Sequence, residues 1–250
     1  MNDLFIRRVL VPDGLPEGSY LAGLPAIRQI AREGLDLQSP VTFFVGENGS
    51  GKSTLLEGIA VAFGFNPEGG SRNFRFSTFD SHSGLHRFLR LWKGARKLRD
   101  GYFLRAESFY NLASNIEQLD RGPMGARIID SYGGISLHEQ SHGESFLSLL
   151  LNRFGGNGLY ILDEPEAALS PMRQMTLLSR IGDLVREGSQ FVIATHSPIL
   201  MAYPGSDLFL LDGSGIRRAP YRETEHYQLT RRFLENPEQM LHYLLDSQTT

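Results

Sequence analysis

Residues 40–64 read PVTFFVGENGSGKSTLLEGIAVAFG and contain three local patterns in succession. Residues 41–45 are all β-branched or aromatic and predict a buried strand. Residues 46–53 match the pattern G-x-x-x-x-G-K-[ST], and a helical pattern then runs to Gly64. Because glycines let backbone N–H groups close around phosphate oxygens at the positive end of a helix, this order of strand, loop and helix predicts a phosphate-binding loop.

The phosphate-binding loop supplies the candidate nucleotide contacts. We expect Lys52 to reach the β- and γ-phosphates of a bound nucleotide and Ser53 to ligate Mg²⁺. The expected contacts with the nucleotide are Gly46, Glu47, Asn48, Gly49, Ser50, Gly51, Lys52, Ser53 and Thr54. A glycine-rich turn with an incidental lysine is the alternative, and the strand and helix on the correct sides of the loop argue against it.

Two adjacent acids, Asp163 and Glu164, follow a second apolar run at Leu159–Leu162. An aspartate at the carboxyl end of a buried strand beside the phosphate loop lies where Mg²⁺ binds, and the second acid can polarise the water that attacks the γ-phosphate. Acids at a strand end are often ordinary loop residues, so this assignment depends on the buried strand and the phosphate loop together.

The other periodic segments predict an α/β fold, with a mainly parallel sheet flanked by helices, an antiparallel β portion and a small helical arm. Ser170, Pro171 and Gly188 mark the beginning and end of a helix that connects two buried strands. Further strands are expected at Leu4–Val11, Phe191–Ala194 and Leu208–Leu211, and a C-terminal helix at Gln239–Leu245. We expect residues 1–250 to form a single domain, in which about residues 66–156 form an inserted arm and the helix that follows it.

The composition predicts a globular protein in a reducing compartment. The 250 residues are 41% hydrophobic, which is enough for a full core, and contain no cysteine. The N-terminus lacks the continuous apolar core of a signal peptide and no apolar run approaches the length of a membrane span, so we expect a cytoplasmic protein without membrane insertion. The formal charge of −3 excludes a globally basic nucleic-acid binder.

The segment LDEPEAALSP, which is followed by a predicted strand and by ATHSP, resembles the ATP-binding cassette (ABC) ATPases. The resemblance covers about Leu4–Leu211 and implies an ABC-type P-loop NTPase fold with ATP and Mg²⁺ as ligands. It makes Asp163 an acid of the Mg²⁺ site, Glu164 the general base and His196 the sensor of the γ-phosphate. Residues 168–170 become the D-loop of this pattern.

The stretch HEQSHGESF, residues 138–146, combines serine, histidine and carboxylate side chains, as a hydrolase site does. A hydrolytic pair is disfavoured because Ser141, His142 and Glu144 are too close in sequence to face one another on a helix. Within the resemblance to ABC ATPases, Ser141, Gly143 and Glu144 align with the serine, second glycine and glutamine of the LSGGQ signature. The alignment implies that the start of the next helix caps the γ-phosphate held by a partner subunit, and hence a head-to-tail homodimer around ATP. A simple helix N-cap is compatible with that role.

The middle of the chain departs from the ABC pattern. The candidates for the missing Gln loop are Glu107, which would also be a metal ligand, and Gln118. The aromatic residue that stacks on adenine in transporter subunits is not identifiable. Both departures favour soluble ABC proteins related to the SMC and RecF heads, and small bacterial ATPases with GENGSGKST and SHGESF motifs, over transporter subunits.

Basic and apolar residues are interleaved over Arg87–Arg99. The apolar residues Leu85, Phe88, Leu89 and Trp92 recur at helical spacing, which predicts an amphipathic helix with a basic face. A solvated helix face is the common explanation for such a run, and a nucleic-acid backbone or an acidic protein partner is the sharper hypothesis.

These patterns together predict a soluble ABC-type ATPase that hydrolyses ATP with Mg²⁺, dimerises on ATP binding and drives a conformational output, with DNA-related or defence processes as candidate settings. Two alternatives stay open. One is the ATP-binding subunit of a membrane transporter, and the other is a nucleotide-gated binding module with negligible turnover.

Overall fold

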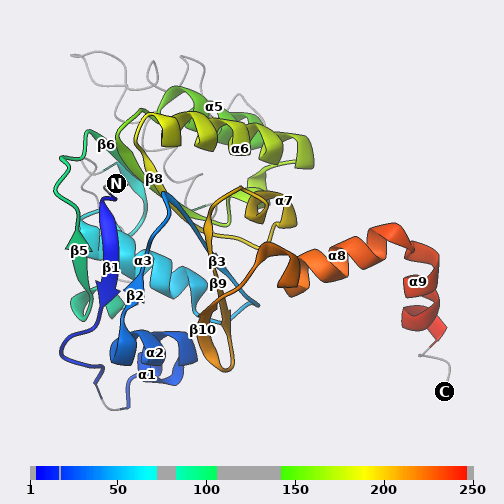
Figure 1. Ribbon diagram of the computed structural model, residues 1–250, viewed down its shortest axis with the longest axis horizontal. Coiled ribbons are helices and arrows are strands. Elements are labelled where there is room, and N and C mark those ends of the chain that lie inside the picture. The colour runs from blue at the N-terminus through cyan, green and yellow to red at the C-terminus, as the bar shows by residue number, and fades with distance from the viewer. Residues whose placement is uncertain (1–3, 17, 72–82, 106–141, 247–250) are drawn as a thin grey trace.

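The computed structural model describes residues 4–16, 18–71, 83–105 and 142–246. Within these residues the chain forms two β-sheets with helices packed against them (Figure 1). The larger sheet contains, in spatial order, β10 (Gly215–Arg218), β9 (Asp207–Asp212), β3 (Val41–Val45), β8 (Gln190–Ala194), β7 (Gly158–Asp163), β6 (Asp100–Arg105) and β4 (Gly70–Ser71). Its inner strands are parallel, and β10 and β4 join the two edges in antiparallel orientation. The smaller, antiparallel sheet contains β2 (Leu35–Asp36), β1 (Ile6–Leu10) and β5 (Arg90–Lys93), in that order.

Helices cover both faces of the larger sheet. On one face, Phe44 of β3 belongs to a core cluster with Leu55 of α3 (Lys52–Phe63). On the other face, Phe43 belongs to a cluster with residues of α5 (His142–Asn152) and α6 (Pro171–Arg186), two helices that lie side by side in Figure 1. Burial on both faces explains why β3 is apolar without alternation. The remaining helices are α1 (Tyr20–Gly23), α2 (Pro25–Glu33), α7 (Pro198–Met201), α8 (Glu225–Glu235) and α9 (Pro237–Asp246).

The predicted fold class and most of the predicted elements are confirmed. The expected strands correspond to β1, β3, β7, β8 and β9, and the expected helices to α3, α5, α6 and α9. Gly64 ends α3 in the left-handed region, with φ +113°, a conformation that glycine adopts without strain. The Ser170 hydroxyl caps α6 by accepting a hydrogen bond from the backbone N–H of Arg173 at 3.4 Å.

The prediction of an amphipathic helix over residues 85–99 is wrong. A single 3₁₀ turn, Leu85–Arg87, is followed by β5, which pairs with β1, and then by β6, which lies next to β7. Leu85 and Leu89 are buried against α3, but Trp92 is 59% exposed on the edge strand β5. The spacing of the apolar residues therefore fits a turn and a strand as well as a helix, and pairing with β1 decides between them.

Part of the predicted arm lies in the sheets. β4 and β6, which fall within residues 66–156, are strands of the larger sheet. Residues 106–141 lie outside the described part of the chain, so the arm and its boundaries stay a prediction. Among the helices that the structure does describe, none is long and apolar enough to cross a lipid bilayer.

Candidate functional site

The predicted nucleotide residues meet at the carboxyl ends of three neighbouring parallel strands. Gly46 follows β3, Asp163 is the last residue of β7, and His196 comes two residues after β8. Since β8 lies between β3 and β7, the three segments reach the same edge of the sheet. Ligands of open α/β sheets bind at this edge, because loops and helix N-termini converge there.

Two glycines give the phosphate loop its shape. A Cβ atom on Gly46 would lie 2.1 Å from the carbonyl oxygen of Leu211 in β9, so only glycine allows this close approach to the neighbouring strand. Gly51 adopts a left-handed conformation, with φ +94°, immediately before α3 begins. The loop therefore packs tightly against the sheet and leads directly into the N-terminus of α3, the arrangement that binds phosphate.

Lys52 is held inside this loop. Its Nζ donates hydrogen bonds to the backbone oxygens of Gly46 at 2.8 Å and Glu47 at 2.9 Å, and the residue is buried. Burial lowers the pKa of Lys52, while the nearby carboxylates of Glu164 and Asp163 act in the opposite direction. An ammonium group has three N–H donors, so one remains for a ligand beside the two bonds to the loop.

Ser53 and Asp163 form an oxygen pair suited to a divalent cation. The Ser53 hydroxyl donates to Asp163 Oδ1 at 3.0 Å, across 110 residues of sequence. A hydroxyl and a carboxylate are the hard oxygen donors that Mg²⁺ prefers, so these residues fit the expected ion. Glu107, the third predicted metal residue, lies outside the described residues, as does Gln118.

Arg105 also belongs to this cluster, although no sequence motif singles it out. Its Nη1 lies 2.8 Å from Glu57 Oε2, and its Nε lies 3.8 Å from Asp163 Oδ2. Glu57 additionally accepts hydrogen bonds from the backbone N–H and the hydroxyl of Ser83. Arg105 is the last residue of β6 and is directly opposite Asp163 in the parallel pairing of β6 with β7. Arg105 therefore places a positive charge beside the Asp163 carboxylate.

Glu164 has an unusual backbone conformation. Its φ of +48° and ψ of +54° place a non-glycine residue in the left-handed region. Its backbone N–H donates to Ala194 O at 2.9 Å, and its Oε1 lies 3.3 Å from His196 Nε2. Backbone strain of this kind concentrates at functional sites, where surrounding contacts maintain it. The strained turn directs the carboxylate towards His196 instead of letting it follow the strand.

His196 is held by two side chains that the sequence did not single out. Its backbone N–H donates to Glu166 Oε1 at 2.5 Å, and its ring Nδ1 lies 3.1 Å from Nε2 of His226. His196 Nε2 is buried and, among the described residues, makes no contact with hydrogen-bond geometry, despite its proximity to Glu164. Burial lowers the pKa of His226, and the neighbouring His196 and Lys52 lower it further.

A cavity of about 480 Å³ lies beside the phosphate loop. His226 contributes to its wall together with residues 46–50 and the end of β9. A cavity of this size suits a small-molecule ligand. The described residues that line it are Pro25, Gly46, Glu47, Asn48, Gly49, Ser50, Leu210, Leu211, Asp212, Gly213, Arg217, Glu223, Glu225 and His226.

The predicted signature residues lie elsewhere, at the start of α5. A Cβ atom on Gly143 would lie 2.7 Å from Ala168 O, so the glycine lets α5 pack against the predicted D-loop. Glu144 Oε1 lies 3.2 Å from Arg173 Nη2 on α6. Neither residue is among those that line the cavity, and Ser141 is outside the described residues. Gly143 and Glu144 therefore do not form part of the cavity beside the chain's own phosphate loop.

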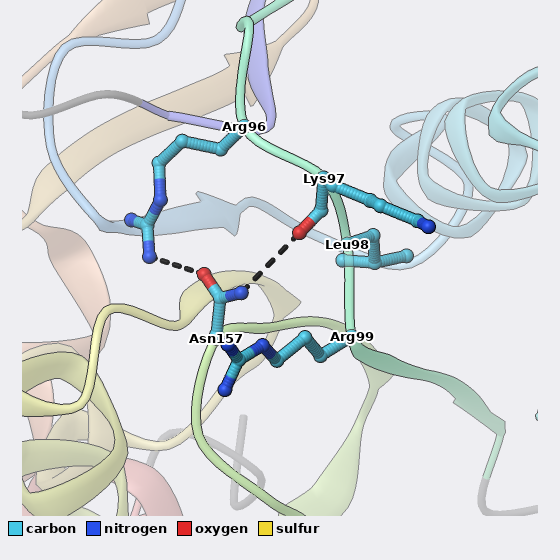
Figure 2. Close-up of a pocket in the computed structure, with 5 residues that line it drawn as sticks. All are labelled: Arg96, Lys97, Leu98, Arg99 and Asn157. Carbon is cyan, nitrogen blue, oxygen red and sulfur yellow. Dashed lines mark hydrogen bonds between the residues drawn. The ribbon is translucent and has the colours of Figure 1, made fainter.

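The last basic residues of the 87–99 segment, Arg96, Lys97 and Arg99, lie near the opposite end of the larger sheet. A surface recess of about 780 Å³ is lined by residues 96–99 and Asn157, next to the residues that begin β6 and β7. Figure 2 shows the side chains of these lining residues. Arg96 is engaged in the fold, since its guanidinium donates to Asn157 Oδ1 and, at 3.1 Å, to Gly188 O. Lys97 and Arg99 are exposed. The recess is therefore separate from the phosphate loop, which lies at the carboxyl ends of the strands.

Comparisons with known proteins find matching family models and relatives of this chain. Two family models match, one to residues 24–97 and one to residues 90–202; both describe AAA domains, and the second also names the AbiEii toxin of a Type IV TA system. A relative from Haemophilus influenzae, described as an uncharacterized ABC transporter ATP-binding protein, is 25% identical over 195 residues, which cover 70% of this chain and 71% of the relative.

Solved structures share the fold across nearly the whole chain. A nucleotide-free ATP-binding cassette from an ABC transporter aligns with a TM-score of 0.52 at 17% identity, covering 93% of this chain and 96% of that one. MJ1267, an ATP-binding cassette of an ABC transporter, aligns with a TM-score of 0.50 at 17% identity, covering 96% and 99%. The chain is therefore an α/β protein with the fold of an ABC-type ATP-binding cassette.

Proposed function

We propose that this chain binds ATP with Mg²⁺ and hydrolyses it to ADP and phosphate. The observation that carries the proposal is the Ser53–Asp163 pair, 3.0 Å apart, next to the buried Lys52 at the start of α3. This pair joins the phosphate loop to a strand-end carboxylate and puts oxygen ligands for a metal beside N–H donors for phosphate. Neither the phosphate loop nor the strand-end carboxylate alone would distinguish a nucleotide site from an ordinary loop.

The phosphates would lie on the loop of residues 46–54. The backbone N–H groups at the start of α3 and the third donor of Lys52 supply positive charge there. Ser53 and Asp163 would hold Mg²⁺, with Glu107 as the proposed additional ligand. Mg²⁺ bound at these residues would neutralise charge that develops on the phosphate oxygens.

Glu164 is the proposed general base. Its carboxylate would accept a proton from the water that attacks the γ-phosphorus, as the bond from that phosphorus to the β–γ bridging oxygen breaks. His196 lies 3.3 Å from Glu164 Oε1, and its unbonded Nε2 is in position to donate to an oxygen of the γ-phosphate. The strained backbone at Glu164 supports this role, because it places the carboxylate against His196.

The metal requirement provides the direct test. Asp163→Asn keeps the size of the side chain but removes a negative charge, so we expect the Mg²⁺ concentration for half-maximal phosphate release to rise and the turnover to fall by at least about a hundredfold. Asp183→Asn on the solvent-facing side of α6 is the matched control and should behave as wild type. Equal Mg²⁺ dependence in the two variants would remove Asp163 from the metal site.

We also propose that two chains close head to tail around ATP. The start of α5, with Gly143 and Glu144, packs against residues 165–168 and Arg173 and does not line the cavity beside the chain's own phosphate loop, so in the proposed dimer it would face a partner's γ-phosphate. Ser141 would supply the contacting hydroxyl. In a mixture of Ser141→Arg and Lys52→Ala chains, each inactive alone, one intact site should form in the mixed dimer and restore part of the activity. Mixed dimers without recovered activity would count against this arrangement.

A transporter subunit is the second candidate, because the relative and the solved structures are described as ATP-binding proteins or cassettes of ABC transporters. A chain with this role should co-purify with a membrane protein and hydrolyse ATP faster when the two are reconstituted. A chain that works alone, like the soluble ABC proteins, should reach its full turnover without a membrane partner.

The exposed basic residues at 87–99 are a proposed site for a nucleic-acid backbone or an acidic protein. Arg87, Arg90, Lys93, Lys97 and Arg99 are exposed, whereas Arg96 is bound within the fold. Affinity for duplex DNA that falls steeply between 50 and 200 mM salt, by about a thousandfold or more for six or more phosphate contacts, would support the nucleic-acid option. No binding even at low salt would exclude it.

A further inference from the structure

We propose that His226 is a positioning residue that fixes the ring tautomer of His196, so that the N–H of His196 lies on Nε2 and faces the catalytic side of the site. This inference rests on the proposed function, which gives His196 and Glu164 their roles. His226 would not contact the γ-phosphate during the reaction. It would act only through His196.

The geometry joins three side chains in a row. His226 Nε2 lies 3.1 Å from His196 Nδ1, and His196 Nε2 lies 3.3 Å from Glu164 Oε1. His226 comes from the first turn of α8, 30 residues after His196 in the sequence, and also lines the cavity beside the phosphate loop. The planes of the two rings are inclined by 50° to each other. The rings meet through His226 Nε2 and His196 Nδ1, and their faces are not stacked.

Only one of the two facing nitrogens can carry the proton of this hydrogen bond when both rings are neutral. In the first arrangement, His226 Nε2–H donates to His196 Nδ1, and His196 carries its own proton on Nε2. In the second, His196 Nδ1–H donates to His226 Nε2, and His226 carries its own proton on Nδ1. The two arrangements differ in what they present to Glu164 and in what they leave buried.

Glu164 at one end of the row and His226 Nδ1 at the other both favour the first arrangement. A carboxylate only accepts hydrogen bonds, so the Glu164 carboxylate attracts an N–H on His196 Nε2 and repels a lone pair there. Among the described residues neither His196 Nε2 nor the buried His226 Nδ1 has a partner with hydrogen-bond geometry, but His196 Nε2 lies 3.3 Å from a carboxylate oxygen of Glu164, so a proton there faces a carboxylate, whereas a proton on His226 Nδ1 would be an orphaned donor. Orphaned buried N–H groups are rarer in proteins than unsatisfied acceptors. His226 therefore donates, and His196 keeps its proton on Nε2.

The surroundings of His226 keep it neutral and in place. The buried Thr224 caps α8 by accepting from the backbone N–H of Tyr227 at 3.3 Å, which fixes the first turn of the helix. Burial, the neighbouring His196 and the Lys52 ammonium lower the pKa of His226 and outweigh the carboxylates of Glu225 and Glu47, so a second proton on the His226 ring is disfavoured. A neutral imidazole with a fixed orientation is the form that can orient another histidine.

Two substitutions at His226 separate the effect of its hydrogen bond from the effect of its shape. His226→Phe fills a similar volume but cannot donate, and His226→Gln retains an N–H donor near the position of Nε2. We expect His226→Phe to lower kcat about ten- to a hundredfold, the cost typical of losing the partner that orients a metal-binding histidine, with little change in the KM for ATP. His226→Gln should restore most of kcat. His242→Asn, on the exposed α9, is the matched control and should retain wild-type kinetics.

The tautomer can be read directly in the nucleotide-free protein. The chain has seven histidines, so ¹⁵N-histidine labelling and long-range ¹H–¹⁵N correlation spectra, assigned with single-histidine variants, are practicable. We expect His196 to be protonated on Nε2 in the wild type, and its unprotonated Nδ1 signal to shift when His226→Phe removes the hydrogen bond. If His226→Phe does not fold, the wild-type spectrum and the His226→Gln kinetics still decide the question.

A proton on His196 Nδ1 in the wild type, or wild-type kcat in a folded His226→Phe protein, would overturn the proposal. Failure of the proposed function would look different. It would appear as absence of ATP turnover in the wild type, whereas the tautomer of His196 would still be measurable and would still be decided by the bond to His226.

Discussion

Arg105 offers a prediction that can be worked out from the structure, because it connects the buried Glu57 to the Asp163 carboxylate. The perturbation is Arg105→Met, which keeps much of the side-chain length but removes the charge and the donors. Glu57 is 8% exposed and would lose its 2.8 Å partner while keeping its two bonds from Ser83. A hydrogen bond to a charged group contributes about 1.5–3 kcal/mol to stability.

The expected loss of stability in Arg105→Met lies inside that range. Arg105 is 25% exposed, so water partly screens its interaction and replaces some of it. Since Glu57 retains two hydrogen bonds, we expect Arg105→Met to lower the free energy of unfolding by about 2 kcal/mol. For a chain of this size that corresponds to a fall in Tm of about 4–8 °C.

The assay is urea denaturation of the single variants and of the double variant Arg105→Met/Glu57→Gln. The double variant should lose about 1–2 kcal/mol less than the sum of the two single losses, because each single change leaves the other charge without its partner. Arg87→Met, at an exposed arginine on the neighbouring turn, should change stability by less than about 0.5 kcal/mol. A loss below that value for Arg105→Met, or strictly additive losses in the double variant, would refute the reasoning.

Three further predictions concern the loop and the opposite end of the sheet. Gly46→Ala should weaken ATP binding at least tenfold in calorimetry, because its Cβ would lie 2.1 Å from a carbonyl oxygen of β9, whereas Gly84→Ala, with open space around it, should not. Tyr160→Phe should destabilise the fold by about 1–3 kcal/mol in urea without changing kcat, since the buried hydroxyl bonds Asp100 at 2.7 Å, far from the phosphate loop at the other end of β7. Burial raises the pKa of Asp100, but the Tyr160 hydroxyl and Arg153 outweigh it and hold this pKa below its ordinary value. The carboxylate therefore contributes stability that is present above about pH 4 and is lost as the pH falls through the folded pKa, so stability measured against pH should be flatter on the acid side in Asp100→Asn.

Local sequence patterns were sufficient for the elements that carry the phosphate loop and the strand-end acids. The strand before Gly46 and the helix after it are contiguous in the sequence, and the β7 strand ends where its apolar run ends, at Asp163. Ser53 and Asp163 are 110 residues apart, yet both follow rules for the carboxyl edge of a parallel sheet, so their proximity could be anticipated. Their roles in metal binding and catalysis remain predictions.

Residues that depend on strand register or on a late helix could not be anticipated in the same way. Arg105 reaches Asp163 only because β6 lies next to β7 in parallel register, and the sequence around it had suggested a helix just upstream. His226 reaches His196 because α8 begins beside the cavity, before the helix leads away from the sheets (Figure 1). No local motif marks either contact, since each is set by tertiary packing.

The central claim is that Glu164 is the base for ATP hydrolysis, and single-turnover phosphate release with Mg²⁺ and ATP tests it most directly. Glu164→Gln keeps the shape of the side chain but cannot accept the proton, so we expect ATP to bind with an unchanged Kd, phosphate release to fall by about 10²- to 10⁴-fold, and an ATP-bound dimer to accumulate. Glu238→Gln, on the exposed α9, should release phosphate at the wild-type rate. Release by Glu164→Gln at the wild-type rate would contradict the account.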